Sequence, residues 1–533
     1  MSTPPWMDTL LAPRTYPEPP ETVRLVQTHI SWVFLAGETV YKVKKPVDFG
    51  FLDFTTLDRR AHFCREEVRL NRRLCPDIYL GVVPITETDG TYALDGPGRV
   101  VEWAVAMRRL PEAGMMQRLI GEERLGPDEM ERIVRRLVPF YREAASGPDV
   151  LRHGGLDTVR FNTEENFEQA APFVGDLLDP AAFEEIRGYA RSFLDRNAGL
   201  FAERERKGRI REGHGDLYSA NICFDPEGDE VYIFDCIEFN ERFRCGDVAS
   251  DVAFLAMDLD YHGLADLSRD FTDAMARRLP DEELAAVMDF YKCYRAFVRC
   301  KIGCFTQAAP GIAPDDREAA RREARRYLRL AHRYAGGGAA PTLYVFFGLS
   351  GTGKSTLAAA WAEKTGLPLY NSDRVRKEMA GLAPESREWE PFGQGIYDEA
   401  HTRRTYSGLI RRAGRHLAAG ESVILDATYR SRRERARLRK VAEAAGARTR
   451  FVLCTCPEPE IRRRLEDRAA GPSVSDGRWE IYLRQRAVFE PPEDIPPGEL
   501  VVVETTAAPE ALLDRYLAGT ALSRGAGNPG GPR

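Results

Sequence analysis

The sequence lacks a long apolar run, a C-x-x-C pair and a basic N-terminal segment followed by an apolar core. The first absence argues against a transmembrane helix, which needs about 18 consecutive apolar residues. The ten cysteines are scattered along the chain, which disfavours a zinc site and favours reduced thiols. Because no signal peptide is evident, we expect a cytoplasmic protein without a membrane partner.

The sequence also lacks a strong net charge, and its length is too great for one hydrophobic core. A net charge of −6 disfavours a protein that coats nucleic acid. The content of hydrophobic residues, 43%, and of charged residues, 30%, is typical of a globular protein. A chain of 533 residues is expected to form two or three domains.

Glycine and alanine gather at residues 334–341, between a charged helical run and an apolar run of strand length. Such a stretch indicates an interdomain linker. The first domain should consist of a strand-rich small lobe at 21–110 and a helical lobe at 111–333. The other boundaries that we expect are an extended N-terminus at 1–20, a first domain at 21–333, a second domain at 342–520 and a disordered tail at 521–533.

The stretch from Gly348 to Ser355 fits the pattern G-x-x-x-x-G-K-[ST] at every fixed position. It follows an apolar run at 343–347 and precedes a predicted helix, so its backbone N–H groups would face phosphate oxygens. Lys354 would reach the β- and γ-phosphates, and Ser355 would hold Mg²⁺. No N-K-x-D motif is present, which favours ATP over GTP. The residues predicted to bind ATP are Gly348, Ser350, Gly351, Thr352, Gly353, Lys354, Ser355 and Thr356.

Two acidic residues of the second domain follow predicted strands. Asp373 comes shortly after the run at 367–370, and Asp426 ends the run at 422–426. The carboxyl ends of parallel strands meet at one edge of a sheet, so we expect both carboxylates near the phosphate loop. Asp426 would then reach the Mg²⁺ shell or the acceptor. Asp373 is also compatible with a purely structural role as the N-cap of a helix.

These features resemble a branch of small P-loop kinases that holds polynucleotide kinases, gluconate kinases and zeta-type toxins. The resemblance implies a parallel sheet sandwiched by helices, with Asp373 activating the acceptor hydroxyl and Arg376 helping to hold the acceptor. It also implies substrate contacts from Thr428 and Arg430, which follow Asp426.

In the same kinases an arginine-bearing lid closes over the γ-phosphate and stabilises its transition-state charge. Arg464 and Arg468 lie four residues apart on a predicted helix at 457–468, hence on one face. They are the candidate lid arginines. A solvated arginine face is the alternative.

The first domain carries a second phosphoryl-transfer pattern. His214, Gly215 and Asp216 are followed by Asn221, and Asp235 ends the apolar run at 231–234. Phosphoryl transfer requires a carboxylate at the acceptor hydroxyl and metal ligands beside the phosphates. A hairpin between Asn221 and Asp235 would bring these groups together.

This pattern resembles the catalytic core of the aminoglycoside phosphotransferase family, which has a protein-kinase-like fold of two lobes. The resemblance implies a catalytic role for Asp216 and metal-binding roles for Asn221 and Asp235. His214 should brace the loop by hydrogen bonding. Asp247 is interpreted as a structural residue that bonds the catalytic loop.

In the small lobe, Lys42 is the best candidate for the lysine that contacts the α- and β-phosphates, with Lys44 as the alternative. Glu67 would be its helix partner, with Glu66 as the alternative. No G-x-G-x-x-G precedes Lys42, so only the predicted hairpin near Gly37 could cover the phosphates. This departure leaves open an atypical kinase or a nucleotide-binding lobe without catalysis.

The whole layout, a multidomain α+β and α/β chain, resembles bacterial proteins described as bifunctional aminoglycoside phosphotransferase/ATP-binding proteins. It implies an ATP-dependent phosphotransferase with two nucleotide sites that acts on a hydroxyl of a small molecule, such as a sugar or sugar acid. One alternative is a 5′-hydroxyl polynucleotide kinase with nucleic acid as the acceptor, since the arginine-rich stretch 432–435 could follow a phosphate backbone. Another is a P-loop kinase regulated by an inactive nucleotide-sensing domain. The sequence fixes neither the acceptor nor the oligomeric state.

Overall fold

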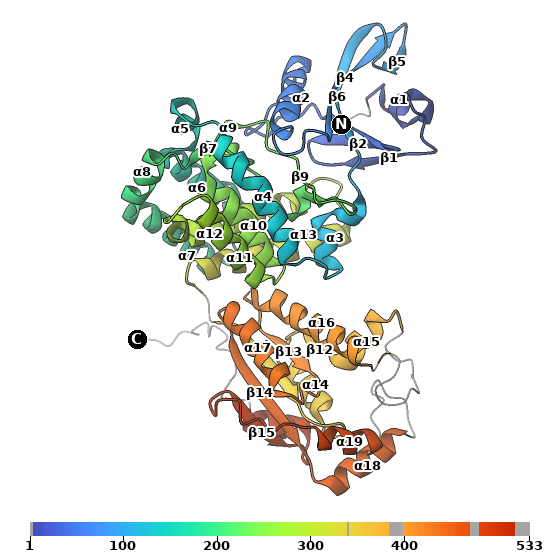
Figure 1. The fold of residues 1–533 in the computed structure, drawn as a ribbon, viewed down its shortest axis with the longest axis vertical. Helices are drawn as coiled ribbons and strands as arrows, with labels where there is room; N and C mark the ends of the chain where they lie inside the picture. The colour runs from blue at the N-terminus through green and yellow to red at the C-terminus, as the bar shows by residue number, and fades with distance from the viewer. Residues whose placement is uncertain are drawn as a thin grey trace, which may run out of the picture. The chain divides into compact units, whose positions relative to one another are not determined.

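The computed structural model divides into two compact units. Unit 1 contains Met1–Leu259 and Asp266–Gly337, and unit 2 contains Asp260–Ala265 and Gly338–Arg533. Figure 1 traces the chain. The residues that the structure describes are 4–337, 340–382, 396, 398–418, 420–469 and 479–516.

Unit 1 begins with a six-stranded antiparallel sheet in the order β1-β2-β3-β6-β4-β5. Side chains alternate between its two faces. Trp32 and Phe34 pack on one face, whereas Lys42 and Lys44 point to the opposite face, toward Glu67 of helix α2. The elements of this lobe are β1 (Val23–Gln27), β2 (Ser31–Ala36), β3 (Thr39–Lys44), α2 (Leu57–Asn71), β4 (Tyr79–Thr88), β5 (Thr91–Leu94) and β6 (Arg99–Arg108).

The N-terminal segment differs from the extended chain expected at 1–20. It forms α1 (Met7–Leu11) and a 3₁₀ turn, η1 (Pro13–Thr15). Trp6 and Leu10 are buried in the same core as Trp32, against which Trp6 packs edge-on at 5.4 Å. Burial of this apolar surface outweighs the tendency of the prolines to keep the segment extended.

A helical lobe follows, built around the largely buried helices α10 and α12. Short strands interrupt it: β7 (Ile210–Glu212) pairs with β10 (Cys245–Asp247), and β8 (Ile222–Phe224) pairs with β9 (Val231–Ile233). The sheet lobe and the helical lobe together form the kinase-type arrangement expected from the sequence. The helices are α3 (Met116–Gly121), α4 (Pro127–Glu143), α5 (Pro148–Gly154), α6 (Leu156–Ala170), α7 (Pro180–Arg196), α8 (Ala198–Arg206), α9 (Glu241–Arg244), α10 (Val248–Tyr261), α11 (Ala265–Arg278), α12 (Leu284–Ala308) and α13 (Pro314–Tyr334), with 3₁₀ turns η2 (Glu112–Gly114), η3 (Ala171–Phe173) and η4 (Ser219–Asn221).

Unit 2 is a five-stranded parallel sheet in the order β12-β13-β11-β14-β15. Its strands are β11 (Thr342–Phe347), β12 (Leu369–Asn371), β13 (Val423–Asp426), β14 (Arg448–Thr455) and β15 (Leu500–Glu504). Its helices are α14 (Lys354–Thr365), α15 (Ser372–Met379), α16 (Glu399–Ala418), α17 (Arg432–Ala444), α18 (Glu458–Ala469), α19 (Trp479–Ala487) and α20 (Pro509–Tyr516).

Both faces of this sheet are covered, as the apolar run of its central strand predicts. Leu343, Val345 and Phe347 of β11 belong to a core with residues of α16 and α17. Tyr344 and Phe346 of the same strand belong to a core with residues of α14 and α20. The predicted parallel sheet sandwiched by helices is therefore confirmed.

In the described part of the chain, no helix has the length and apolar character that crossing a bilayer would require. All ten cysteines lie among the described residues, and none of them is in a disulfide bond.

A buried guanidinium holds the helical lobe together. Arg204 of α8 is fully buried and makes two hydrogen bonds to each of two carboxylates, those of Asp247 and Asp281, at 2.6 to 2.9 Å. It thereby ties α8 to β10 and to the turn before α12. Removing one partner of such a pair leaves an uncompensated buried charge.

We expect Arg204→Leu to lower the free energy of unfolding of unit 1 by about 3–5 kcal/mol, because both aspartates would stay buried without a cation. Hydrogen exchange followed by mass spectrometry in increasing denaturant reads unit 1 peptides separately and measures this loss. The matched control is Arg206→Leu, because Arg206 is exposed and pairs with Glu203 at the surface. Equal stability of the two variants would contradict the assigned role of Arg204.

Candidate functional site

The phosphate loop of unit 2 lies where the sequence places it, between the end of β11 and the start of α14. Gly351 and Gly353 have left-handed backbone angles, with φ of +82° and +80°. A Cβ on Gly353 would also lie 2.8 Å from the hydroxyl oxygen of Thr505. These glycines are therefore required by conformation and by space, and the loop from Gly348 to Thr356 lies at a helix N-terminus, an arrangement that can bind an anion.

Asp426 lies beside this loop at the carboxyl end of β13. It is paired in register with Phe346 of β11 and with Asn371 of β12. Its side chain is almost fully buried, and Asn371 Nδ2 donates a hydrogen bond of 2.6 Å to its Oδ2. Burial raises the pKa of Asp426, while Lys354 and the Ser355 hydroxyl oppose that rise. Its Oδ1 is buried and has no hydrogen-bond partner among the described residues.

The N-cap of helix α15 is Asn371, which sequence reasoning missed. Its Oδ1 accepts hydrogen bonds from the N–H groups of Asp373 and Arg374. The capping alternative for Asp373 is therefore wrong. The charge of Asp373 contributes to raising the pKa of Asp426. A polar residue directly at the end of an apolar run was the signal that could have identified Asn371.

The three residues predicted to bind the acceptor, Arg376, Thr428 and Arg430, differ in their burial. Arg376 is buried and donates 3.0 Å hydrogen bonds to the backbone oxygen of Ile396 and to Thr402 Oγ1. Its guanidinium thus contacts the region where α16 begins. Thr428 and Arg430 follow β13 and are half-buried. The acceptor roles of these residues stay predictions.

Arg464 of α18 approaches the phosphate loop through Thr505. It donates hydrogen bonds to the hydroxyl and carbonyl oxygens of Thr505 at 3.1 and 2.5 Å. The Thr505 hydroxyl donates in turn to the carbonyl oxygen of Thr352, at 2.6 Å. Arg462, by contrast, is exposed and pairs with Glu466, so the solvated-face alternative describes Arg462 but not Arg464. The side chain of Arg468 lies outside the described residues.

Helix α19 also contacts the phosphate loop. The side-chain oxygen of Gln485 accepts a 2.9 Å hydrogen bond from the N–H of Ser350. A phosphate oxygen that takes this N–H must first displace the amide of Gln485. Neither Thr505 nor Gln485 belongs to a local motif, and sequence reasoning missed both.

In unit 1 the loop from His214 to Asn221 has the expected compact form. Asn221 Nδ2 donates to the backbone oxygen and to Oδ2 of Asp216, at 2.9 and 3.0 Å. The buried His214 ring accepts from the N–H of Asp216 at Nδ1 and lies 3.0 Å from the carbonyl oxygen of Phe234 at Nε2. Burial lowers the pKa of His214 to about 4, so the ring is neutral and braces the loop.

The residue that bonds the catalytic loop is Asp251, not Asp247. The Asp251 carboxylate accepts from the N–H groups of His214 and Gly215, at 2.7 and 3.0 Å, and from Tyr141 Oη at 3.1 Å. Asp247 instead pairs with Arg204. The prediction was wrong because β10 ends at Asp247, and only the first turn of α10 carries an aspartate up to the loop.

Lys42 and Glu67 meet as predicted, and Lys44 joins them. The fully buried Glu67 carboxylate lies 2.9 Å from Lys42 Nζ and 2.6 Å from Lys44 Nζ. Lys44 also pairs with the buried Glu238, which sequence reasoning missed. Burial alone would raise the pKa of Glu67, but the two lysines outweigh it and lower that pKa to about 2. Of the two lysines only Lys42 lines the cavity described below.

Asp235 completes this cluster. Its Oδ1 lies 2.6 Å from Lys42 Nζ, and its side chain is 45% exposed. Its backbone is left-handed, with φ of +62°, which is uncommon for a residue other than glycine. Glu66, the alternative partner, pairs instead with Arg69 on the surface of α2.

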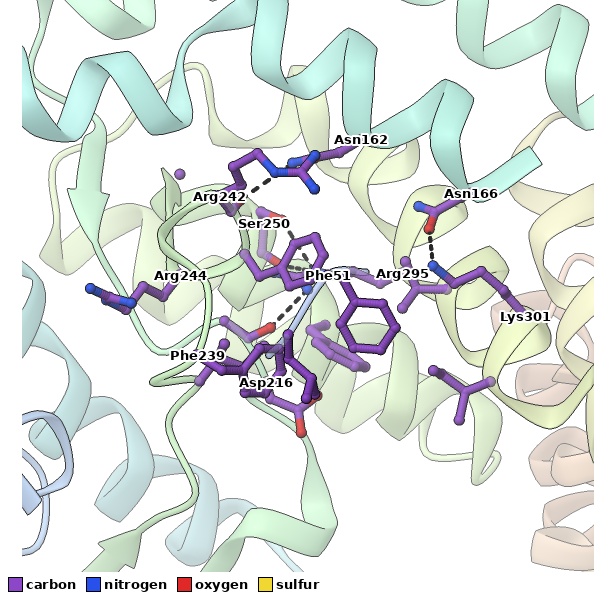
Figure 2. A pocket seen from close by; sticks show the side chains of 18 of the residues that line it. Phe51, Asn162, Asn166, Asp216, Phe239, Arg242, Arg244, Ser250, Arg295 and Lys301 are labelled. Atoms are coloured by element: carbon purple, nitrogen blue, oxygen red, sulfur yellow. Dashed lines mark hydrogen bonds between the residues drawn. The ribbon is translucent and has the colours of Figure 1, made fainter. Parts of the chain in front are cut away.

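A cavity of about 970 Å³ opens between the two lobes of unit 1. Lys42, Asp216 and Asp235 all line it (Figure 2 shows Asp216). Its volume lies within the range of small-molecule sites. Desolvation raises the pKa of Asp216 to about 6, while Arg299 opposes the rise. Other lining residues, which sequence reasoning missed, are Phe51, Asn162, Asn166, Phe239, Arg242, Arg295 and Lys301.

The turn that faces this cavity from the sheet is not the one predicted. Thr28, His29 and Ile30, between β1 and β2, line the cavity. Gly37 is not among the described lining residues. In the β2–β3 register Ser31 pairs with Lys44 and Ala36 with Thr39, so the Gly37 hairpin lies at the opposite end of these strands from Lys44. The turn at 28–30 is therefore the candidate cover for a nucleotide.

The described residues contain no group of three or more His, Cys, Asp or Glu side chains that could hold a metal.

The chain is similar to one family model and to proteins of two mycobacteria. A family model described as an AAA domain matches residues 343–492. Uncharacterized proteins of Mycobacterium tuberculosis and Mycobacterium bovis are 31% identical over 462 residues, which cover 86% of this chain and 89% of each relative.

Two solved structures are similar to parts of the chain. A sugar kinase from Janibacter sp. HTCC2649 is 20% identical, with 33% of this chain and 92% of that chain covered and a TM-score of 0.24. The GDP complex of aminoglycoside 2′-phosphotransferase-IIIa is 14% identical, with 61% of this chain and 99% of that chain covered and a TM-score of 0.39.

We expect Glu67→Gln to weaken ATP binding by unit 1 at least tenfold, because a neutral amide cannot hold the two lysines in place. The measurement is calorimetry with Mg²⁺ and ATP on the full chain carrying Lys354→Ala, which removes binding by unit 2. Glu66→Gln is the control, since Glu66 forms only a surface pair on the same helix. An unchanged affinity in Glu67→Gln would show that Lys42 needs no buried partner.

Proposed function

We propose that this chain, which belongs to the same family as the mycobacterial proteins of which it covers 89%, is an ATP-dependent phosphotransferase with two nucleotide sites. Each site would transfer the γ-phosphoryl group to a hydroxyl of a small molecule, such as a sugar or sugar acid. The observation that carries the proposal is the placement of carboxylates by separate elements. In unit 1, Glu67 and Asp235 contact Lys42, and in unit 2, Asp426 lies opposite Phe346, two residues before the phosphate loop.

In unit 2 the residues present fit Mg·ATP. The buried Asp426 Oδ1 lacks a hydrogen-bond partner among the described residues, as an oxygen reserved for a cation or its bound water would. Ser355 and Asp426 would hold Mg²⁺, which neutralises charge on the phosphates when bound. Lys354, at the first turn of α14, would orient the β- and γ-phosphates beside the loop N–H groups.

The other candidate residues of unit 2 would act on the acceptor or on the transferred phosphoryl group. Asp373 would accept the proton of the acceptor hydroxyl as that oxygen bonds to the γ-phosphorus, and ADP leaves with the electrons of the broken bond. Arg464 would contribute positive charge near the loop, where Thr505 positions its guanidinium. Arg376, Thr428 and Arg430 are proposed to bind the acceptor, and Arg468 to assist Arg464.

In unit 1 we assign the corresponding roles to Lys42, Asp216, Asn221 and Asp235. Lys42 would bind the phosphates, and its present partner Asp235 would turn to a metal ion together with Asn221. Asp216 would accept the proton of a hydroxyl that enters the cavity. All four of these residues are present, and Glu67 contacts Lys42. Their presence supports a catalytic domain over the alternative of an inactive nucleotide-sensing domain.

The polynucleotide alternative for unit 2 loses part of its basis. Arg435 belongs to the stretch that was expected to contact a phosphate backbone. It is fully buried and forms an ion pair with Asp494 at 2.6 Å. Arg432 pairs with Glu493 at 3.2 Å. A small-molecule acceptor is therefore the better proposal, and a 5′-hydroxyl oligonucleotide serves as one member of the test panel.

Two variants should separate the sites. Lys354→Ala should abolish transfer by unit 2, and Asp216→Asn should abolish transfer by unit 1, because each removes a group that acts on the reacting phosphate or hydroxyl. Transfer of labelled phosphate from ATP is measured with sugars, sugar acids and a 5′-hydroxyl oligonucleotide. Residual transfer in the double variant would contradict the assignment, and preference for the oligonucleotide would establish the alternative acceptor.

Asp373 should separate acceptor chemistry from nucleotide binding. We expect Asp373→Ala to keep its ATP affinity, measured by calorimetry with Mg²⁺, but to transfer on the order of a hundredfold more slowly. Asp426→Asn should instead weaken Mg²⁺-dependent ATP binding. If Asp373→Ala also loses ATP affinity, Asp373 belongs to the metal site and the role of base passes to another group.

A further inference from the structure

One end of the cavity in unit 1 has no part in the chemistry assigned above. Its wall comes from α6 and α12, which contribute Asn162, Asn166 and Lys301. Figure 2 shows the Asn166–Lys301 pair apart from Asp216, with Phe51 and Arg295 drawn between them. This wall therefore faces a part of the ligand other than the reacting hydroxyl.

Lys301 is the unusual residue of this wall. It is only 8% exposed, yet its Nζ donates to two neutral groups, Asn166 Oδ1 at 2.6 Å and Gln169 Oε1 at 2.8 Å. Among the described residues no carboxylate forms an ion pair with it. Glu165, which acts on it over a longer range, pairs instead with Arg242 at 3.4 Å. A buried ammonium without a counter-charge is costly, and an anionic ligand would remove that cost.

The charges of the wall have one sign. The lining residues of α6 and α12 include three cations, Arg295, Arg299 and Lys301, and no aspartate or glutamate. Arg295 pairs with Asp251 at 3.5 Å and Arg299 with Glu323 at 3.1 Å, so Lys301 is the cation of this wall that forms no ion pair among the described residues. The carboxylates of the cavity lie on the segment 216–251, and several are already engaged: Asp247 binds Arg204, Asp251 binds the catalytic loop, and Glu238 binds Lys44. A ligand with several ammonium groups would meet like charges at this wall.

Aromatic rings form the remaining boundary. Phe51 packs against Phe239 and Phe243 with ring centroids 6.2 Å apart in both pairs, and all three line the cavity. Phe305 of α12 lies 6.0 Å from Lys301 Nζ. Apolar rings beside a buried cation suit a ligand that combines an apolar body with an anionic group.

We propose that the acceptor of unit 1 carries an anionic group, such as a carboxylate, that binds at Lys301 while its hydroxyl approaches Asp216. A polycationic aminoglycoside is then the wrong charge class for this cavity. The hydroxyl half of this statement rests on the proposed function, whereas binding of the anion by Lys301 does not.

Three probes that differ only in charge test the proposal: 4-(hydroxymethyl)benzoate, 4-(hydroxymethyl)benzamide and 4-(hydroxymethyl)benzylamine. Their binding is measured by calorimetry on the full chain with Lys354→Ala, in the presence of Mg²⁺ and a non-hydrolysable ATP analogue. We expect the benzoate to bind at least tenfold more tightly than the benzamide, and the benzylamine most weakly.

Variants on α12 locate the effect. Lys301→Gln should make the benzoate and the benzamide bind almost equally, while Lys301→Arg should keep the preference. Lys292→Gln is the control, because Lys292 lies on the same helix but contacts Ser268. Burial lowers the pKa of Lys301 to about 8; the negative charge of Glu165 opposes this shift, and the positive charge of Arg242 adds to it. The preference should therefore decline above about pH 8 in the parent chain but persist in Lys301→Arg.

Several outcomes would overturn the proposal: equal binding of the three probes, tightest binding of the benzylamine, an undiminished preference in Lys301→Gln, or no binding of any probe at millimolar concentration. Transfer of labelled phosphate from ATP to the hydroxymethyl group is measured separately. If the charge order holds without transfer, the proposed function of unit 1 fails and the anion site stands. If transfer occurs without the charge order, the anion site fails and the proposed function of unit 1 stands.

Discussion

The geometry of unit 1 depends on one buried carboxylate, that of Glu67. Away from water, a carboxylate must be paired, and Glu67 meets this need with two lysines from the same strand. Each lysine in turn binds an acidic residue of the helical lobe, Lys42 to Asp235 and Lys44 to Glu238. The network thus fixes the sheet lobe on the helical lobe and directs Lys42 into the cavity that Asp216 also lines. Glu67 therefore both positions Lys42 and helps to hold the two lobes of unit 1 together.

The same constraint acts differently in unit 2. Asp426 is as deeply buried as Glu67, but the described residues satisfy only one of its oxygens, through Asn371. Glu67 is paired with two lysines, whereas Asp426 forms no ion pair among the described residues. A buried carboxylate without a paired cation beside the phosphate loop is the reason that we propose a cation site in this unit. Thr505, directly after β15, donates a hydrogen bond to the phosphate loop, and Arg464 of α18 in turn donates a hydrogen bond to Thr505.

Under the proposed function, reaction type and acceptor choice would reside in different parts of unit 1. Lys42, Asp216 and Asp235 would act on the phosphoryl group and the reacting hydroxyl, which every acceptor shares. Discrimination between acceptors would then depend on the wall of α6 and α12, where Lys301 contacts two neutral amides. This division explains how one fold can serve unrelated acceptors, since the wall can change while the catalytic loop stays.

The sequence by itself determined the phosphate loop, the loop from His214 to Asn221 and the strand pattern of unit 2, because each depends on neighbouring residues, glycine conformations or side-chain alternation. It also placed Lys42 with Glu67, by resemblance. Only the tertiary structure decided which aspartate bonds the loop from His214 to Asn221, Asp251 rather than Asp247, and which turn of the sheet lobe lines the cavity. It alone brought Glu238 to Lys44 across 194 positions and Asn166 to Lys301 across 135. Such partners leave no local signal, because burial and packing of distant segments, and not the spacing of residues along the chain, select them.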